Sequence, residues 1–289
     1  MSGWGFVVAH SSAKNAERRG NRHSVRIHPP ESDSSILSSP TSRIVGSGRF
    51  LYEREVRKRL KKLAYKRTIV CLANSRKLQG RCVAGLELSE TTLGSWIRPV
   101  SSSEKGELSA ERFYPNWKEP ELLDIIEIEF LRPRTAAGHC EDHFVNGARK
   151  WLLKGSFGRK HLKSAIEQVR GCLWFDGGST SNGENDKIPL EAAAKLRSSL
   201  KLVQPNELTM WVQIEGASFG KARKKVRGRF SLAGVDYVFA VTDSFIEREF
   251  KDAPEGTERT IASPMLCLSV SEVFEKQNAC YKLIAGVLE

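Results

Sequence analysis

The chain has 289 residues, of which 40% are hydrophobic and 28% are charged, and its formal net charge is +12. No apolar run approaches the ~18 residues of a membrane-spanning helix, so the sequence predicts a soluble protein with no membrane partner. Residues 1–67 hold 15 Lys and Arg against 5 Asp and Glu, whereas the rest of the chain holds 31 against 29. The positive charge therefore belongs to the leader, and the net charge is no evidence that the folded part binds nucleic acid.

Residues 1–66 are predicted to be a disordered basic leader. Met1–Gly48 is rich in Ser, Arg, Asn and Gly, and it cannot bury enough surface to offset the chain entropy lost on folding. Residues 50–66 are compatible with a basic helix, because four apolar side chains fall loosely on one face. Such a helix would be a nucleic-acid-binding arm, an amphipathic surface helix or a solvated, frayed segment. A wrongly assigned gene start is a further alternative for the leader.

Residues 67–135 are predicted to form a first OB-like β unit. Thr68–Ala73, Arg81–Leu88 and Trp96–Val100 are rich in Val, Ile and Leu and are separated by polar turns, as in a small antiparallel barrel. In Leu122–Leu131, acidic residues alternate with apolar ones at the period of a strand with one wet face. Four or five strands in about 65 residues is the size of one OB barrel.

Residues 136–206 are predicted to be a mixed helical insert. Arg159–Arg170 places apolar residues at helical spacing and ends at a glycine, a common helix stop. Residues 176–187 are loop-forming. A second helix is expected over Leu190–Leu200, because Pro189 suits the first turn of a helix.

Residues 207–289 are predicted to form a second OB-like β unit, with Ala233-Gly234 as a hairpin turn. Its expected strands are Leu208–Ile214, Lys225–Leu232, Val235–Thr242, Met265–Val270 and Ala279–Leu288. The predicted fold class is therefore mainly β with a helical insert (α+β). Two OB-like antiparallel barrels in tandem follow a disordered basic N-terminal extension.

Six short motifs stand out in the folded region: ANSRK (Ala73–Lys77), GRCVAG (Gly80–Gly85), WIRPVS (Trp96–Ser101), GELS (Gly106–Ser109), ENDKI (Glu184–Ile188) and CYKLIA (Cys280–Ala285). Together they resemble the bacterial dual OB-fold domain family. The resemblance covers residues 66–289 and excludes the leader. It implies two tandem OB folds, a nucleic-acid-binding role without established catalytic residues, and service in defence against phage or other mobile elements.

OB folds bind single strands with cations placed beside aromatic rings on which bases stack. A first candidate set lies in the first turn and on the strands around it: Arg76, Lys77, Arg81, Trp96 and Arg98. Trp96 and Arg98 are two residues apart, so they face the same side of a regular strand. The alternative is that Trp96 belongs to the core and that Arg98 is a solvated charge at the rim.

A second candidate set lies in Lys221–Arg229, which has six basic residues and no acid. The predicted contacts are Lys221, Arg223, Lys224, Lys225, Arg227 and Arg229, with Tyr237 across the hairpin. The two residues in the expected turn, Arg223 and Lys224, would contact phosphates without reading the base sequence. The alternative is a solvated hairpin edge whose charges prevent aggregation.

Patterns for catalysis or metal binding are weak, so no catalytic residue, metal or cofactor is predicted. One loop triplet lacks the fourth ligand of a structural zinc site: His139, Cys140 and His143. A set of acids has no spacing specific to a magnesium-dependent nuclease: Asp142, Glu184 and Asp186. The six cysteines form no CxxC pair and are interpreted as reduced thiols in a cytoplasm.

The sequence therefore predicts a non-enzymatic, cytoplasmic protein that binds single-stranded or structured nucleic acid through tandem OB-like folds. A protein-interaction adaptor for a neighbouring effector is the alternative, which the nearly neutral charge beyond residue 67 favours. A metal-dependent nuclease is less favoured.

Overall fold

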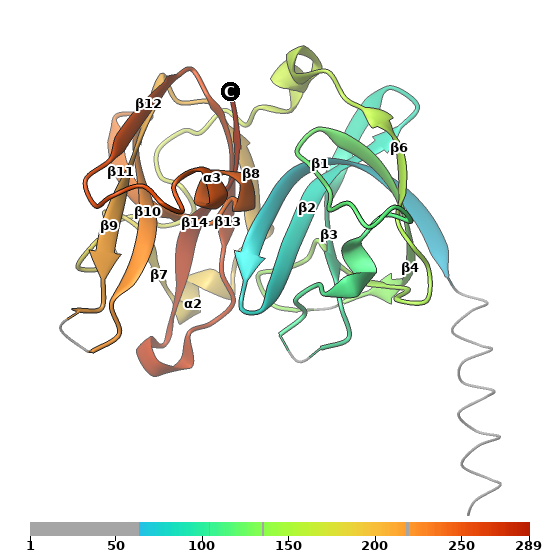
Figure 1. The fold of residues 1–289 in the computed structure, drawn as a ribbon, viewed down its shortest axis with the longest axis horizontal. Helices are drawn as coiled ribbons and strands as arrows, with labels where there is room; N and C mark the ends of the chain where they lie inside the picture. Colours follow the sequence, from blue (N-terminus) through green and yellow to red (C-terminus); the bar gives the residue numbers. More distant parts are fainter. Residues whose placement is uncertain (1–63, 104, 135, 218–219) are drawn as a thin grey trace, which may run out of the picture. The chain divides into compact units, whose positions relative to one another are not determined.

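The computed structural model describes residues 64–103, 105–134, 136–217 and 220–289. In this part of the chain, two β-sheets are accompanied by short helical segments (Figure 1). The predicted leader lies outside the described residues except at its end, where Tyr65 and Lys66 begin the first strand. No helix in the described part is long and apolar enough to cross a membrane.

The first sheet closes into a five-stranded barrel, called barrel 1 below. In this circuit β1 pairs with β2, β2 with β3, β3 with β5, β5 with β4, and β4 again with β1. The β3–β5 pairing is parallel and the others are antiparallel, and β6 adds to β4 outside the circuit. The strands are β1 (Tyr65–Lys77), β2 (Gly80–Ser89), β3 (Thr92–Val100), β4 (Asp124–Pro133), β5 (Asp142–Val145) and β6 (Leu152–Ser156), with the 3-10 helix η1 (Ala110–Arg112) between β3 and β4.

The alternation predicted for β4 is confirmed. Ile126, Ile128 and Phe130 are fully buried in the core of barrel 1. Glu127 points outward and forms an ion pair with Lys66 of β1 at 2.8 Å. A strand with one wet face thus closes the barrel, because its apolar side chains all reach the same interior.

The second sheet has the same strand order and is called barrel 2. The three strands β9, β10 and β11 form an antiparallel meander, β11 pairs in parallel with β14, and β14 pairs with β13. The circuit returns to β9 through β12, which is separated from β13 only by Ser263 and Pro264. The strands are β9 (Glu207–Glu215), β10 (Arg223–Leu232), β11 (Val235–Val241), β12 (Glu258–Ala262), β13 (Met265–Val270) and β14 (Ala279–Leu288), with the 3-10 helix η4 (Glu275–Gln277) before β14.

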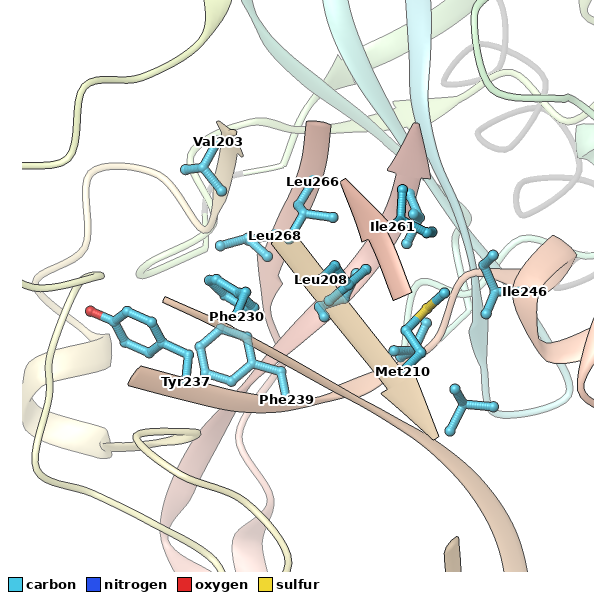
Figure 2. Close-up of a cluster of buried hydrophobic side chains, with 14 of the residues drawn as sticks. Val203, Leu208, Met210, Phe230, Tyr237, Phe239, Ile246, Ile261, Leu266 and Leu268 are labelled. Atoms are coloured by element: carbon cyan, nitrogen blue, oxygen red, sulfur yellow. The ribbon is translucent and has the colours of Figure 1, made fainter. Parts of the chain in front are cut away.

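The core of barrel 2 is built around three aromatic rings (Figure 2). The ring centroids of Phe230, Tyr237 and Phe239 lie 5.3 to 5.4 Å apart. Gly228 faces the same core, where a Cβ atom would lie 2.7 Å from Ile284. The outward side of β10 is therefore the side of Lys225, Arg227 and Arg229, as alternation predicts.

In the predicted mixed helical insert, residues 136–206, helical segments occur at both expected places but are short, and strands that were not predicted lie between and around them. The segment contributes β5 and β6 to barrel 1, and it adds β7 (Lys187–Pro189) to β14 and β8 (Leu200–Val203) to β13. Its helices are the 3-10 segment η2 (Arg159–Ala165) and the single turn α2 (Leu190–Ala193). The helical spacing of apolar residues did not reveal these strands. Each of them forms its backbone hydrogen bonds with a strand that is distant in sequence, and such pairing leaves no local pattern.

A third apolar core joins the two barrels. The outer face of β1 and β2, including Val70 and Leu86, packs against the outer face of β8, β13 and β14, including Leu202 and Met265. A Cβ atom on Gly286 of β14 would lie 2.1 Å from the Leu72 backbone oxygen of β1. The barrels are therefore packed strand against strand, at a separation that only glycine allows.

Candidate nucleic-acid interface

A cationic groove lies where the end of β1 meets barrel 2. It has a volume of about 260 Å³ and is called the seam groove; its lining residues are Arg76, Arg223, Lys224, Lys225, Val226, Glu247, Phe250 and Lys251. Five of these side chains are basic and one is acidic. Most of them come from β10 and from the helix α3 (Ser244–Glu249) with the residues after it. The structure thus brings Arg76 together with the Lys221–Arg229 cluster, although they are far apart in sequence.

Local structure holds the end of β1 against barrel 2. The backbone N–H of Arg76 donates to the carbonyl of Thr242 at 2.8 Å. The Arg76 guanidinium binds both carboxylate oxygens of Glu247, with Nε at 2.9 and 3.0 Å. The side chain of Asp243 caps α3 by accepting from the N–H groups of Phe245 and Ile246. These contacts fix the basic wall and the single carboxylate of the seam groove.

Three cations of the seam groove are available to a ligand. Among the described residues, the side chains of Arg223, Lys225 and Lys251 have no hydrogen-bond or ion-pair partner. Burial lowers the pKa of the Lys225 ammonium, and the positive charge of Arg76 lowers it further. Lys224 is different, because its Nζ donates to the carbonyls of Lys251 and Ala253 at 2.8 and 2.6 Å. Several cations crowded beside one carboxylate form a surface that attracts anions.

Other predicted cations lie outside the seam groove. Lys77 pairs with Glu272 at 3.3 Å, and Arg81 pairs with Glu119 at 3.5 Å. Arg229 is exposed, and its guanidinium lies 5.4 Å from the centre of the Trp211 ring. Lys221 is exposed and precedes the first strand residue of β10. The predicted set is therefore divided over several places, of which the seam groove holds the largest part.

The prediction that Arg98 contacts nucleic acid is wrong, because its side chain is buried between the barrels. Its Nε donates to Asp142 at 2.6 Å and its Nη1 donates to Ser199 of barrel 2 at 2.9 Å. His139 and Glu141 complete this cluster, called the interbarrel lock: Arg98, His139, Glu141, Asp142 and Ser199. The rim charge expected at the end of β3 is instead an internal ion pair.

Electrostatics in the interbarrel lock favour a neutral histidine. Burial and the nearby Arg98 guanidinium lower the pKa of His139 to about 3. Its Nδ1 accepts from the Nη2 of Arg98 and lies 3.1 Å from the Ser199 hydroxyl. Burial raises the pKa of Asp142, although Arg98 opposes this effect. Ser199 is fully buried and His139 is partly buried, and their contacts with Arg98 join the two barrels.

Arg227 and Tyr237 are also buried, so their predicted roles are wrong. Arg227 donates to Glu215 at 2.6 Å and to Asp186 at 3.5 Å. Tyr237 is fully buried, and its hydroxyl donates to Asp176 at 2.9 Å and accepts from the N–H of Leu173 at 3.2 Å. Arg227 faces outward and is covered by chain that contains Asp186, whereas the Tyr237 ring lies inside the core of barrel 2.

Residues 176–186, called the covering loop, pair with the backbone of β11 and contact outward side chains of β9 and β10. Glu184 exchanges two backbone hydrogen bonds with Val238 of β11, at 3.1 and 3.0 Å. Asn185 donates to the carbonyl of Asp236 at 3.0 Å, and Asn182 accepts from Gln213 at 3.1 Å. The second and third barrel strands are the face on which OB folds bind oligonucleotides. In barrel 2 this face is partly occupied by the protein's own chain.

Trp96 is half-buried and packs against the core shared by the barrels. It lines a cavity of about 920 Å³ with Leu86, Leu93, Phe157 and His161. The lining, which lies wholly within the described residues, contains no Lys or Arg. Trp96 and Arg98 do share one side of β3 as predicted, but that side faces barrel 2. The ring is thus not a stacking platform beside a row of cations.

The residues considered for metal chemistry do not gather. In the described part of the chain, no group of three or more His, Cys, Asp or Glu residues is placed to hold a metal ion. Asp142 belongs to the interbarrel lock, and Asp186 binds Thr180 and Arg227. His143 contacts the Tyr65 hydroxyl at 2.5 Å. All six cysteines are free.

Sequence reasoning missed the contribution of α3 and the residues after it. Glu247, Phe250 and Lys251 line the seam groove, yet they lie in a segment for which no element was predicted. The available signal was Asp243 followed by Ser-Phe-Ile-Glu-Arg-Glu, because an aspartate often caps the start of a helix. Trp211 was missed because nothing local shows that β9 brings its ring beside Arg229.

Two barrels of this strand order define a pair of OB folds, with a cationic groove where they meet. The chain belongs to the family with a dual OB-containing domain, whose model matches residues 67–287. A search of curated proteins and a search of solved structures each found no match.

Proposed function

We propose that this protein is a cytoplasmic, non-enzymatic nucleic-acid-binding protein that holds a single strand or a structured strand in the seam groove. The observation that carries this proposal is the convergence of Arg76 with Arg223, Lys225 and Lys251 around one carboxylate. Lys and Arg side chains bind phosphates by charge, independently of base sequence. Because the barrels are packed on each other, the groove is held in one geometry and costs little to order on binding.

The test is the salt dependence of oligonucleotide affinity. The triple variant Arg223→Gln, Lys225→Gln, Lys251→Gln is compared with the wild type by fluorescence anisotropy over a range of salt concentrations. The affinity should fall, and the slope of log K against log salt should become shallower by about 2, because each neutralised phosphate of a single strand adds ~0.7 to the slope. A folded variant with an unchanged slope and affinity contradicts the proposal.

The matched control removes the same charge elsewhere. Lys160, Lys163 and Lys195 are exposed, lie outside the seam groove, and are replaced together by Gln. This control should retain the wild-type slope. Both comparisons are repeated on a chain that starts at Ala64, because residues 1–63 hold 13 Lys and Arg against 5 Asp and Glu and attract polyanions by themselves.

The adaptor remains a second candidate, and the cavity at Trp96 is the observation that favours it. An apolar lining with Glu90 and Glu167 and without basic residues suits a partner peptide that carries apolar and basic side chains. Cross-linking followed by mass spectrometry, after nuclease treatment, should identify such a partner at this cavity. A partner that cross-links equally well to Leu93→Asp does not bind there.

A further inference from the structure

A second pocket borders α3 on a face next to the seam groove. It has a volume of about 580 Å³ and is called the side pocket; its lining residues are Asn74, Lys118, Glu119, Pro120, Glu121, Leu122, Asp243, Ser244, Phe245, Arg248 and Val287. Barrel 1 supplies one wall and α3 with β14 supplies the other. This volume lies in the range of pockets that hold small organic ligands.

The side pocket offers an exposed aromatic ring. Phe245 is 55% exposed, although a phenyl ring is normally buried. The guanidinium of Arg248 lies 5.8 Å from the ring centre. An exposed ring beside a cation is the arrangement on which a nucleobase stacks in single-strand-binding proteins.

The side pocket also contains a buried acceptor without a partner. Asn74 is 6% exposed and donates from Nδ2 to the carbonyl of Pro120 at 2.7 Å. Its Oδ1 has no hydrogen-bond partner among the described residues. A buried acceptor left unpaired is unfavourable, and a donor group on a ligand relieves this cost. The exocyclic amino groups of adenine, cytosine and guanine are such donors.

Charge decides which part of a nucleotide fits. The lining of the side pocket has three carboxylates, those of Glu119, Glu121 and Asp243, against two cations, Lys118 and Arg248, so its charges do not favour a phosphate. The seam groove, in contrast, is lined mainly by cations. Asn74 and Arg76 are two residues apart on β1, a separation of roughly 7 Å along a strand. This distance matches one nucleotide step, so a base and the neighbouring phosphate can reach the two sites together.

We propose that the side pocket binds one unstacked nucleobase with an exocyclic amino group. The base stacks on Phe245 and donates to the Asn74 Oδ1, while the adjoining phosphates lie in the seam groove. This inference rests on the proposed function and adds a base-binding site to it. It also explains why an aromatic ring is left exposed beside a buried acceptor that has no partner among the described residues.

The test uses the full chain and a labelled adenine single strand of about 12 nucleotides, a length within the site sizes of OB folds. Phe245→Ala should lower the affinity by roughly 5- to 150-fold, the value of one stacked base, and leave the salt slope unchanged. The control is Phe274→Ala, which removes a ring that is 47% exposed but lies outside both sites. It should leave the affinity unchanged. Wild-type affinity in Phe245→Ala, or an equal loss in both variants, overturns the proposal.

Base identity gives a second measurement. A thymine strand has no exocyclic amino group, so it should bind the wild type about 2- to 10-fold more weakly than the adenine strand. The difference should disappear in Phe245→Ala. Equal affinity of the wild type for the two strands contradicts the role of Asn74.

Free adenosine separates this proposal from the proposed function. Saturation-transfer NMR should detect adenosine bound to the wild type and to the triple variant of the seam groove, but not to Phe245→Ala. If adenosine binds in this way and no oligonucleotide does, the proposed function fails while the side pocket stands. If the oligonucleotide binds through the seam groove and adenosine does not bind, the side pocket fails alone.

Discussion

The guanidinium of Arg98 in barrel 1 lies 2.9 Å from the hydroxyl oxygen of Ser199 in barrel 2. The same guanidinium neutralises Asp142 at 2.6 Å, and both side chains of this ion pair are almost completely buried. A charge removed from water in this way is stable only with its partners present. The contact therefore ties the relative position of the barrels, and with it the seam groove, to one buried network.

Replacing Arg98 should destabilise the fold without a direct effect on ligand contacts. Arg98→Ala leaves Glu141 buried without a cation and leaves Asp142 with only its longer ion pair to Arg134 at 3.6 Å, which costs about 3 kcal/mol in the free energy of unfolding. Arg229→Ala removes an exposed arginine of barrel 2 and should change that free energy by less than about 0.5 kcal/mol. Urea denaturation of both variants measures the difference. Equal stability of the two variants is inconsistent with a buried lock.

His139 should make stability depend on pH. The pKa of His139 in the folded protein is about 3, whereas its ordinary value is 6.5. Between these values the unfolded chain binds the proton and the folded protein does not, so stability is lost as pH falls below about 6.5. At pH 5 the loss from this group is about 2 kcal/mol, at ~1.4 kcal/mol for each pH unit.

The comparison of wild type with His139→Asn isolates this contribution, because the other titrating groups are common to both proteins. The free energy of unfolding is measured by chemical denaturation at pH 7 and pH 5. The wild type should lose about 2 kcal/mol more than the variant between these two pH values. Parallel losses in the two proteins mean that His139 is not held neutral by burial.

Gly286 should be intolerant of any side chain. In Gly286→Ala the new Cβ would lie 2.1 Å from the Leu72 backbone oxygen, so β1 and β14 must move apart. Such overpacking costs about 1–3 kcal/mol and loosens the core between the barrels. Thermal unfolding and limited proteolysis report both effects. Gly94→Ala is the control, because its nearest neighbours lie 3.6 Å or more from the added atom.

Arg227 and Arg223 should behave in opposite ways, although the sequence places them in one basic cluster. Arg227→Gln leaves Asp186 and Glu215 without their cation and should cost about 3 kcal/mol of stability. It should leave the salt slope of oligonucleotide binding unchanged. Arg223→Gln should leave stability within about 0.5 kcal/mol and make the slope shallower. A reversed pattern contradicts the position of the covering loop.

Tyr237 should contribute to stability through its hydroxyl. Tyr237→Phe keeps the ring stack with Phe230 but removes the hydrogen bonds to Asp176 and to the N–H of Leu173. The loss should be about 1–2 kcal/mol, because a buried N–H is left unpaired. Guanidinium denaturation measures it. Oligonucleotide affinity should stay at the wild-type value, since the ring lies in the core (Figure 2).

Much of the fold could be predicted because strand periodicity is a local property of the chain. The alternation around Ile126 and the apolar runs of β1, β10 and β11 identified the strands of both barrels, and motif resemblance identified the family. The strands within residues 136–206 were not predicted, because β5 and β8 are short and their partner strands are distant in sequence. Among the candidate site residues, exposure could not be predicted: Lys225 and Arg227 have the same charge and strand face, but only Arg227 is covered.

The sequence alone determined that the chain is built from two sets of short strands, and that its cations beyond the leader concentrate between residues 221 and 229. Only the tertiary structure decided which cations face solvent. Barrel 2 packs against the outer side of β3, so Arg98 is buried there. The covering loop packs over Arg227 and binds it through Asp186. The physical reason is that strand alternation is set by neighbours one or two residues away. Burial of an outward face, in contrast, depends on chain that is distant in sequence and returns to cover it.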